Sequence, residues 1–324
     1  MGCDYLMRYR FGIDLGGTKI ELVALNQAGE MCWRQRVETP QGDYPATLQA
    51  IMMLVERAQS ELGGYGSIGI GTPGAVSRAT GCLKNSNSVC LIGQPLVDDL
   101  QVLLKQPVRI ANDADCFALS EASDGAAAGR GVVFGVILGT GVGGGIVVQG
   151  RLLQGPNAIA GEWGHNPLPW PQAHERPGPN CYCGKQGCIE TFLSGPGLVR
   201  DCLANSGKAL TVPAMLTGAL AGDPACSAAF ERYEDRLARG LAHVINLLDP
   251  DAIVLGGGLS NCARLYTNVP KQWGQYVFSD RVDTELLPPR HGDSSGVRGA
   301  AWLWGEASDA AIRPPISGRR PDQS

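Results

Sequence analysis

Three cysteines lie within eight residues, in the segment CYCGKQGC at residues 181–188: Cys181, Cys183 and Cys188. Three thiolates on one tight turn are three of the four nitrogen or sulfur ligands that a closed tetrahedral zinc site requires. His165 is the best fourth ligand, because the proline-rich loop before the cysteines can fold back, and His174 inside that loop is the alternative. The cluster therefore predicts a structural zinc ion with no open position for water.

Glycine-rich turns follow three apolar runs: DLGGTK at 14–19, LGTGVGGG at 138–145 and GGGLS at 256–260. Glycine lets backbone N–H groups approach a phosphate closely. GTGVGG also fits the dinucleotide pattern G-x-G-x-x-G, but that site needs a helix next, and the β-branched GIVVQG follows instead. The Walker P-loop pattern does not occur in the sequence. Three such turns together favour phosphate binding.

The segment ANDAD at 111–115 places Asn112 and Asp113 where a strand runs into a helix. Phosphoryl transfer to a hydroxyl needs a carboxylate that accepts the proton of the attacking group. Asn and Asp are also favoured helix caps. The local sequence therefore leaves capping and catalysis open for this pair.

The elements that must position these residues occur twice. FGIDLGGTKIELVAL at 11–25 and FGVILGTGVGGGIVV at 134–148 share the frame Phe-Gly-apolar-x-Leu-Gly, and each predicts strand, glycine turn, strand. A repeat of this kind predicts two related α/β halves, and chance similarity of two hairpins is the alternative.

Other elements follow from periodicity and turn residues. Apolar residues at helical spacing predict a helix over 44–62. Further expected strands lie around 32–37, in the buried segment 67–74, near 107–112 and at 251–255. Further expected helices are one that follows the strand near 107–112 and runs through Asp124, one over 228–248 and a closing helix over 296–304.

Length and composition narrow the class of protein. The chain has 324 residues, 44% of them hydrophobic, and a formal net charge of −4, which argues against a nucleic-acid surface. No stretch has the roughly 18 apolar residues of a membrane helix, and no secretory signal is seen, so we expect a cytoplasmic protein without membrane contact. Residues 1–6 are expected to be an extra arm, and the Pro-, Gly-, Ser- and Arg-rich segment 306–324 a disordered tail.

FGIDLGGTK, GTGVGGG, AGEWGH, CYCGKQGCIE and IVLGGGLS, in this order, resemble the ROK family of sugar kinases and sugar-responsive repressors. The resemblance covers residues 8–304, and it implies an α/β actin-like ATPase (ribonuclease H-like) fold, duplicated around a cleft. The expected domains are 1–115, to which a helix near 295–304 returns, and 116–294 with the zinc-binding turn.

The resemblance also implies roles for individual residues. The ATP-binding residues would be Asp14, Gly16, Gly17, Thr18, Lys19, Gly139, Thr140, Gly141, Gly256, Gly257 and Gly258. Asp14 would act on Mg²⁺ through water, because Mg²⁺ sheds its hydration reluctantly. Asp113 would be the catalytic base. The sugar-binding residues would be Asn87, Asn112, Asp113, Glu162, His165 and Glu190, and Asn85 shares with Asn87 the alternative of an ordinary turn residue. Family members also place a histidine and three cysteines at the positions of His165, Cys181, Cys183 and Cys188.

The resemblance is to bacterial fructokinases in particular, so the expected reaction is ATP-dependent phosphorylation of D-fructose to fructose 6-phosphate, with mannose as a further substrate. A glucokinase or an N-acetylhexosamine kinase is the alternative, and the loop 166–180 is where substrate preference could differ. Family repressors carry a helix-turn-helix domain ahead of the kinase-like part, and the first phosphate loop at residue 14 is expected to leave no room for one. A zinc ribbon that binds nucleic acid would need a second cysteine pair. The family also implies a homodimer.

Overall fold

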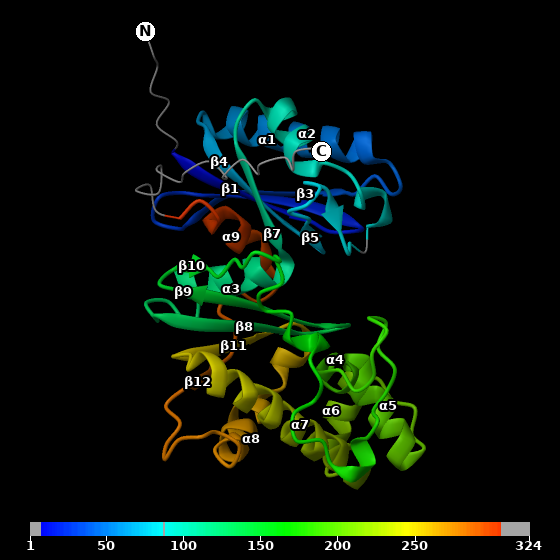
Figure 1. Ribbon diagram of the computed structural model, residues 1–324. Coiled ribbons are helices and arrows are strands. Elements are labelled where there is room, and N and C mark those ends of the chain that lie inside the picture. The colour runs from blue at the N-terminus through cyan, green and yellow to red at the C-terminus, as the bar shows by residue number, and fades with distance from the viewer. Residues whose placement is uncertain (1–7, 87, 306–324) are drawn as a thin grey trace, which may run out of the picture.

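Two five-stranded mixed sheets lie one above the other in the computed structural model, which describes residues 8–86 and 88–305 (Figure 1). The expectations for residues 1–6 and 306–324 lie outside the described residues. The first sheet, in the order β3-β2-β1-β4-β7, consists of β1 (Tyr9–Leu15), β2 (Lys19–Leu25), β3 (Met31–Glu38), β4 (Gly66–Thr72) and β7 (Val108–Asn112). The second, in the order β10-β9-β8-β11-β12, consists of β8 (Val132–Leu138), β9 (Val142–Val148), β10 (Arg151–Leu152), β11 (Ala252–Gly256) and β12 (Glu285–Leu287).

The two sheets have the same topology. In each, the first strand pairs antiparallel with the second, the second with the third, and the first also pairs in parallel with a later strand. Phe11 of β1 and Phe134 of β8 occupy matching positions in the two buried central strands. The repeat predicted from the two Phe-Gly frames is therefore present in the fold, and the actin-like α/β class is confirmed.

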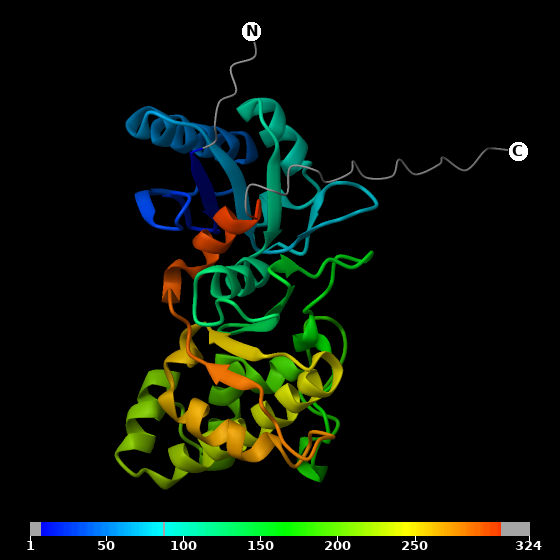
Figure 2. The ribbon, with the colours of Figure 1, turned by 90° about the vertical axis from the view of Figure 1, so that its left-hand side faces the viewer.

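Helices cover the outer faces of both sheets (Figures 1 and 2). The α-helices are α1 (Tyr44–Leu62), α2 (Leu96–Leu104), α3 (Asp113–Ser123), α4 (Ile189–Leu193), α5 (Gly195–Ser206), α6 (Val212–Leu220), α7 (Pro224–Leu248), α8 (Ala263–Trp273) and α9 (Ser295–Trp302). Short 3₁₀ turns are η1 (Val89–Leu91), η2 (Trp163–His165), η3 (Ala173–Glu175), η4 (Gly258–Asn261) and η5 (Gly292–Ser294), and β5 (Ala75–Val76) and β6 (Leu83–Lys84) form a small hairpin.

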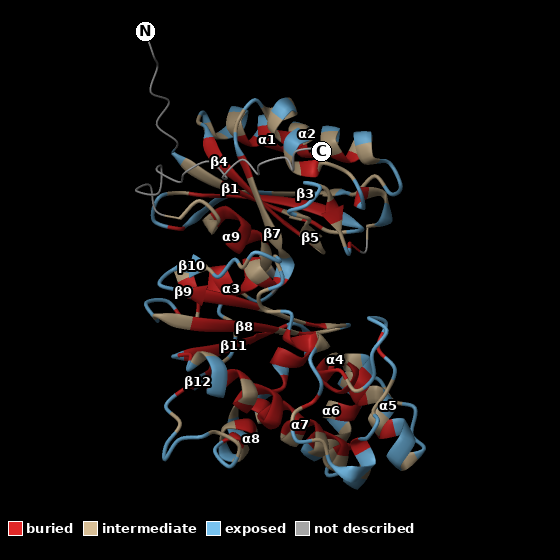
Figure 3. Cartoon of the chain, in the orientation of Figure 1, coloured by how far each residue is buried: buried red, intermediate tan, exposed pale blue. Residues whose placement is uncertain are grey.

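The helix α1 shows how local sequence sets these elements. Asp43 caps its first turn by accepting a hydrogen bond from the Ala46 N–H at 2.9 Å, and Gly63 ends it in the left-handed conformation. Ile51, Val55 and Ala58 form the buried stripe that packs on the first sheet. The central strands of both sheets and the inward sides of the covering helices are buried, and the outer sides of the helices are exposed (Figure 3).

Helices α3 and α9 lie between the two sheets, and each of them packs on the sheet of the other half of the fold (Figure 1). α3 follows the first sheet in the chain but packs on β8 and β9 of the second, whereas α9 follows the second sheet and packs on β1 and β4 of the first. A side chain is impossible where they approach most closely, because a Cβ on Gly299 of α9 would lie 1.6 Å from the Cys116 carbonyl oxygen of α3. The glycines of the two Phe-Gly frames allow the same close approach. A Cβ on Gly12 would collide with α9, and a Cβ on Gly135 would collide with α3.

Most elements expected from periodicity are present, including α1, β4, α3, α9 and a longer α7 that begins at the Asp223 cap. The short helices α2, α4, α5, α6 and α8 were not predicted. α6 buries Met215 alone, so its sequence carries little periodic signal, whereas α8 has Leu265, Val269 and Trp273 at helical spacing and its stripe was overlooked. Within the part of the chain that the structure describes, no helix has both the length and the apolar character needed to cross a membrane.

Gly299→Ala should lower the free energy of unfolding by about 3 kcal/mol or more, because the methyl group must push α9 away from α3. Gly296→Ala is the matched control: it lies in the same helix, where an added Cβ meets nothing within 4 Å, and should be neutral or stabilising by up to about 1 kcal/mol. Urea denaturation of both variants measures the difference. Equal effects would show that this crossing is not tightly packed.

Candidate functional site

The carboxyl ends of three parallel strands of the first sheet meet at one edge. Asp14 near the end of β1 pairs with Gly71, and Thr72 at the end of β4 pairs with Asn112 at the end of β7. Open α/β sheets bind ligands at this edge. The α3 N-terminus begins there, directly after Asn112.

Asn112 and Asp113 both contact the start of α3. The Asn112 side chain accepts a hydrogen bond from the Ala114 N–H at 2.8 Å and donates one to the Gly74 carbonyl at 3.1 Å. Asp113 accepts from the same N–H at 2.8 Å, while its side chain stays exposed at the cleft surface. The surrounding protein displaces part of the water shell, and this desolvation raises the pKa of the Asp113 carboxyl. Capping does not exclude catalysis here, because one Asp113 oxygen remains available.

Asp14 carries an uncompensated charge. Burial, followed by the negative charges of Asp113 and Glu21, raises the pKa of its carboxyl to about 6. Among the described residues no donor forms a hydrogen bond with this carboxylate. Glu21 itself is paired with Arg34 and Arg36. A carboxylate left in this state suits a bound cation, which would favour its charged form.

The first two glycine loops each close with a backbone hydrogen bond, although the bond spans three residues in the first loop and two in the second. Gly16 donates its N–H to the Lys19 carbonyl at 3.0 Å, and Gly139 donates to the Gly141 carbonyl at 3.0 Å. Each loop thus closes on itself and exposes Thr18 or Thr140 at its tip. Within residues 8–86 and 88–305 no acceptor is found for the Gly17 and Thr18 N–H groups. These groups are free to bind phosphate oxygens.

The third glycine loop lies beside the second. A Cβ on Gly257 would approach the carbonyl oxygen of Leu138 to 2.5 Å, so the turn at 256–258 packs on the residue that precedes Gly139. A Cβ on Gly256 would collide with the Phe117 ring of α3. The structure therefore brings the predicted second and third ATP-binding loops together at the second sheet.

A cavity of about 270 Å³ opens between the two halves of the fold. It is lined by Thr72, Gly74, Ala75, Val76, Arg78, Leu83, Ile110, Ala111, Asn112, Asp115, Gly144, Leu153, Gln154, Ala158, Ala160 and Glu162. Its polar groups come from the α3 N-terminus, from Glu162 and from Thr72, Arg78 and Gln154. Its apolar wall comes from the β5–β6 hairpin and the loop 153–160. The size and mixed lining suit a small polar ligand such as a sugar.

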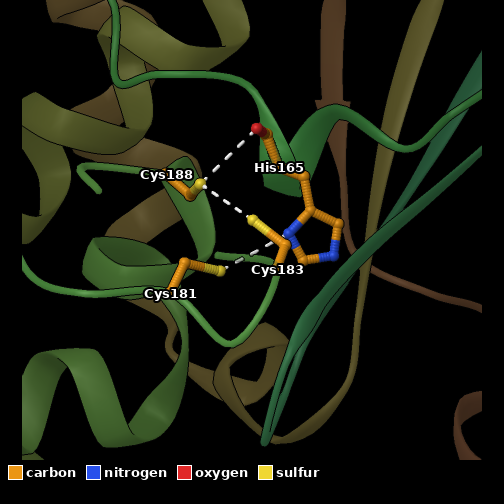
Figure 4. Close-up of side chains that lie close together, drawn as sticks. All are labelled: His165, Cys181, Cys183 and Cys188. Atoms are coloured by element: carbon orange, nitrogen blue, oxygen red, sulfur yellow. Dashed lines mark hydrogen bonds between the residues drawn. The ribbon is translucent and has the colours of Figure 1, made fainter. Parts of the chain in front are cut away.

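Four potential metal ligands converge at the second sheet (Figure 4). The Cys181 Sγ lies 3.6 Å from the His165 Nδ1, and the Cys183 Sγ lies 3.6 Å from the Cys188 Sγ. All four ligand atoms are within 4.8 Å of one another. A tetrahedral ion with sulfur ligands at about 2.3 Å separates those ligands by roughly 3.8 Å, so the donors fit one. His174 is exposed and is not part of this group.

Two contacts join the cysteine turn to the rest of the site. The Glu190 Oε2, two residues after Cys188, accepts a hydrogen bond from the Val142 N–H at 2.9 Å, so α4 is fixed to the second glycine loop. The His165 Nε2 lies 3.0 Å from the Tyr182 hydroxyl. With Nδ1 facing the sulfurs, Nε2 is the nitrogen left for a hydrogen bond.

The structure distributes the predicted sugar-binding residues unevenly. Asn112 and Glu162 line the cavity, whereas Asp113, His165 and Glu190 lie outside its lining. Asn85 is exposed beside Gly74, and Asn87 lies outside the described residues. The loop 166–180, where substrate preference was expected to differ, contributes no lining residue, and the loop 153–162 contributes five.

Thr72, Arg78 and Asp115 line the cavity but were not predicted as site residues. Only Asp115 carried a usable signal, because it lies in the same helical turn as Asp113. Arg78 could not have been found from its neighbours, since the β5–β6 hairpin that carries it is set by tertiary contacts.

A buried ionic cluster anchors the loop 166–180. The Glu175 carboxylate accepts hydrogen bonds from Arg236 at 2.7 Å and from Arg239 at 2.8 and 2.9 Å, and Arg239 also donates to the Trp170 carbonyl at 2.9 Å. Burial alone would raise the pKa of Glu175, but these arginine hydrogen bonds lower it to about 2. The cluster holds the chain that links His165 to Cys181.

Comparison with known proteins gives a consistent result. The model of the ROK family matches residues 10–307. An N-acetyl-D-glucosamine kinase of Yersinia pseudotuberculosis is 41% identical over 299 residues, which cover 90% of this chain and 98% of that protein. An N-acetyl-D-glucosamine kinase of Salmonella newport is 39% identical over 297 residues, with the same coverage.

Solved structures agree with the fold. A ROK hexokinase from Thermus thermophilus has a TM-score of 0.81 at 30% identity and covers 91% of this chain and 97% of its own. A ROK family glucokinase from Streptomyces griseus, in complex with glucose and AMPPNP, has a TM-score of 0.72 at 28% identity and covers 91% and 98%. None of these four proteins is named as a fructokinase, so their names do not support the fructose expectation. The homodimer stays a prediction.

Glu175→Gln should lower the free energy of unfolding by about 3 kcal/mol, because it removes the buried carboxylate that Arg236 and Arg239 share. Each guanidinium then keeps a single carboxylate partner, Asp201 for Arg236 and Asp235 for Arg239. Glu231→Gln, an exposed change on α7, is the control and should have no measurable effect. Because the pKa of Glu175 is lowered on folding, its contribution is complete above the unfolded pKa near 4.3 and is lost as the pH falls toward 2. Urea denaturation between pH 3 and 7 tests both statements, and a variant as stable as the wild type would contradict them.

Proposed function

The chain belongs to the ROK family as a sugar kinase, and we propose that it transfers the γ-phosphoryl group of ATP to a hydroxyl of an N-acetylated hexosamine. The observation that carries this proposal is the cavity, which combines hydrogen-bonding groups at the α3 N-terminus with an apolar wall. The hydroxyls of a hexose match the first, and the methyl of an acetamido group matches the second. The two curated relatives that bear the same activity in their names support the same substrate class.

Asp113 is proposed as the general base. It lies at the cleft end of α3 next to the cavity residue Asn112, and one of its oxygens is free to accept the proton of the attacking hydroxyl. The raised pKa of Asp113 makes it a better proton acceptor than an ordinary aspartate. Asn112, held by Ala114 and Gly74, is rigid enough to orient a neighbouring hydroxyl.

ATP is proposed to bind at the glycine loops, with the phosphates at Gly16–Lys19 and Gly139–Gly141 and the adenosine near Gly256–Gly258. The free N–H groups of Gly17 and Thr18 and the side chain of Lys19 supply donors and positive charge there. Asp14 fits a Mg²⁺ ion through water, since its carboxylate has no other partner among the described residues. The ion would supply neutralisation of the phosphate charge.

Zinc is proposed as the ion held by His165, Cys181, Cys183 and Cys188. Its role is structural, because protein ligands fill the tetrahedron. Coordination through Nδ1 would leave a proton on Nε2 of His165, which lies 3.0 Å from the Tyr182 hydroxyl and can donate to it. Through α4 the same turn fixes Glu190 and the second glycine loop.

Release of ADP from Mg-ATP with fructose, mannose, glucose, N-acetylglucosamine and N-acetylmannosamine tests the substrate class. We expect kcat/KM to be highest for an N-acetylated hexosamine. A maximum on fructose would restore the expectation drawn from the sequence, and a maximum on glucose would show that the apolar wall does not select the acetamido group. No turnover with any sugar would refute the kinase assignment.

Asp113→Asn should reduce kcat roughly 100-fold or more while sugar binding, measured by calorimetry, stays within a few-fold of the wild type. Asp98→Asn is the control, because Asp98 is an exposed first-turn aspartate of another helix, α2, and kcat should not change. Since the base must be deprotonated and its pKa is raised, wild-type kcat should fall on acidification earlier than an ordinary aspartate would allow. Near-normal turnover of Asp113→Asn would remove Asp113 from this role.

Cys183→Ser should abolish stoichiometric zinc, measured by elemental analysis, lower the melting temperature, and raise the sugar KM more than the ATP KM. Cys32→Ser is the control, because Cys32 is an exposed cysteine outside the cluster. One zinc per chain in Cys183→Ser, or unchanged kinetics in the metal-free variant, would contradict the scaffold role.

A further inference from the structure

We propose that Asp115 is a substrate-binding residue of this kinase, whose carboxylate accepts a hydrogen bond from the sugar and thereby contributes to sugar selection. The inference rests on the proposed function and adds to it a residue that neither the sequence motifs nor the relatives assign. Asp115 lies in the first turn of α3, two residues after Asp113, and its side chain lines the 270 Å³ cavity together with Asn112 and Glu162.

Asn112 and Asp113 each have a hydrogen-bond partner within the protein, and the Asp115 carboxylate has none among the described residues. Asn112 uses its amide group for Ala114 and Gly74, and Asp113 accepts from the Ala114 N–H. Among the described residues none donates a hydrogen bond to the Asp115 carboxylate. A largely buried acceptor without a donor is costly, and such groups in native proteins normally find a partner.

The electrostatic surroundings agree with a missing donor. Burial, followed by the negative charges of Glu162 and Asp113, raises the pKa of the Asp115 carboxyl to about 7. Arg78 is the charged group of opposite sign in the cavity lining, but it forms no ion pair with Asp115. A hydroxyl or amide N–H of a sugar would supply the donor without adding charge. An N-acetylated hexosamine carries several such groups.

A purely structural role is the competing explanation, because an acidic residue in the first turn stabilises a helix through its dipole. That role predicts a loss of stability without any change in sugar affinity. The experiment must therefore measure affinity and stability in the same variants.

Calorimetric titration of N-acetylglucosamine into the wild type, Asp115→Asn and Asp115→Ala, each also followed by thermal denaturation, tests the proposal. We expect Asp115→Ala to raise the sugar Kd at least 10-fold, with the KM for ATP within two-fold of the wild type. Asp115→Asn keeps the side-chain shape and guards against misfolding of the alanine variant. Asp98→Ala on α2 is the matched control and should leave the sugar Kd unchanged.

Deoxy analogues of the sugar, each lacking one donor, identify the contact. In the wild type each analogue should bind more weakly than the parent sugar. In Asp115→Ala, one analogue only should bind as tightly as the parent sugar. For that analogue the donor on the sugar and the acceptor on the protein are both absent, so removing the donor costs no further affinity. A Kd within two-fold of the wild type in both Asp115 variants would overturn the proposal.

Separate measurements of sugar binding and of sugar phosphorylation distinguish the proposed role of Asp115 from the proposed kinase function. If the wild type binds the sugar but does not phosphorylate it, the proposed function fails while the comparison of Kd values still decides the role of Asp115. If the wild type binds none of the sugars, both are overturned.

Discussion

The close crossing of α3 and α9 is the contact on which the rest of the molecule depends. Each helix packs on the sheet that lies farther from it in the chain, and Gly299 lets the backbones meet at Cys116. Because α3 begins at Asp113, this crossing also fixes the position of the proposed base and of Asp115. The close packing of Gly299 on Cys116 thus determines where the Asp113 carboxylate lies in the cleft.

The cleft itself is a consequence of strand direction. The parallel strands β1, β4 and β7 all end at one edge, which collects Asp14, Thr72 and Asn112, and the second sheet brings its glycine turns to Leu138 and Gly256. Burial, followed by the charge of neighbouring carboxylates, raises the pKa values of Asp14 and Asp115. Such a group of carboxylates is suited to bind cations and hydrogen-bond donors. In the proposed function, a metal–nucleotide complex would supply the cation and a sugar would supply the donors.

Much of the architecture could be predicted from the sequence, because its signals are local. The Phe-Gly frame marks both central strands, the apolar stripe marks α1, and the short spacing of the three cysteines marks the turn that gathers the four potential metal ligands. Arg78 and the loop 153–162 could not be found in this way, since only the approach of two halves of the chain makes them neighbours. The expectation of fructose failed to gain support for the same reason: selectivity depends on the cavity wall, which has no motif.

The packing of α3 and α9 on opposite sheets also affects how the two halves of the fold can move relative to each other. The chain passes between the two sheets twice, at the start of α3 and between β12 and α9, and the second passage lies against Glu121 near the end of α3. Two connections at separate points define an axis, and rotation about that axis is the motion that they oppose least. Motion of one lobe against the other would then open the nucleotide loops and the sugar cavity in concert, so that one coordinate governs access to both substrates.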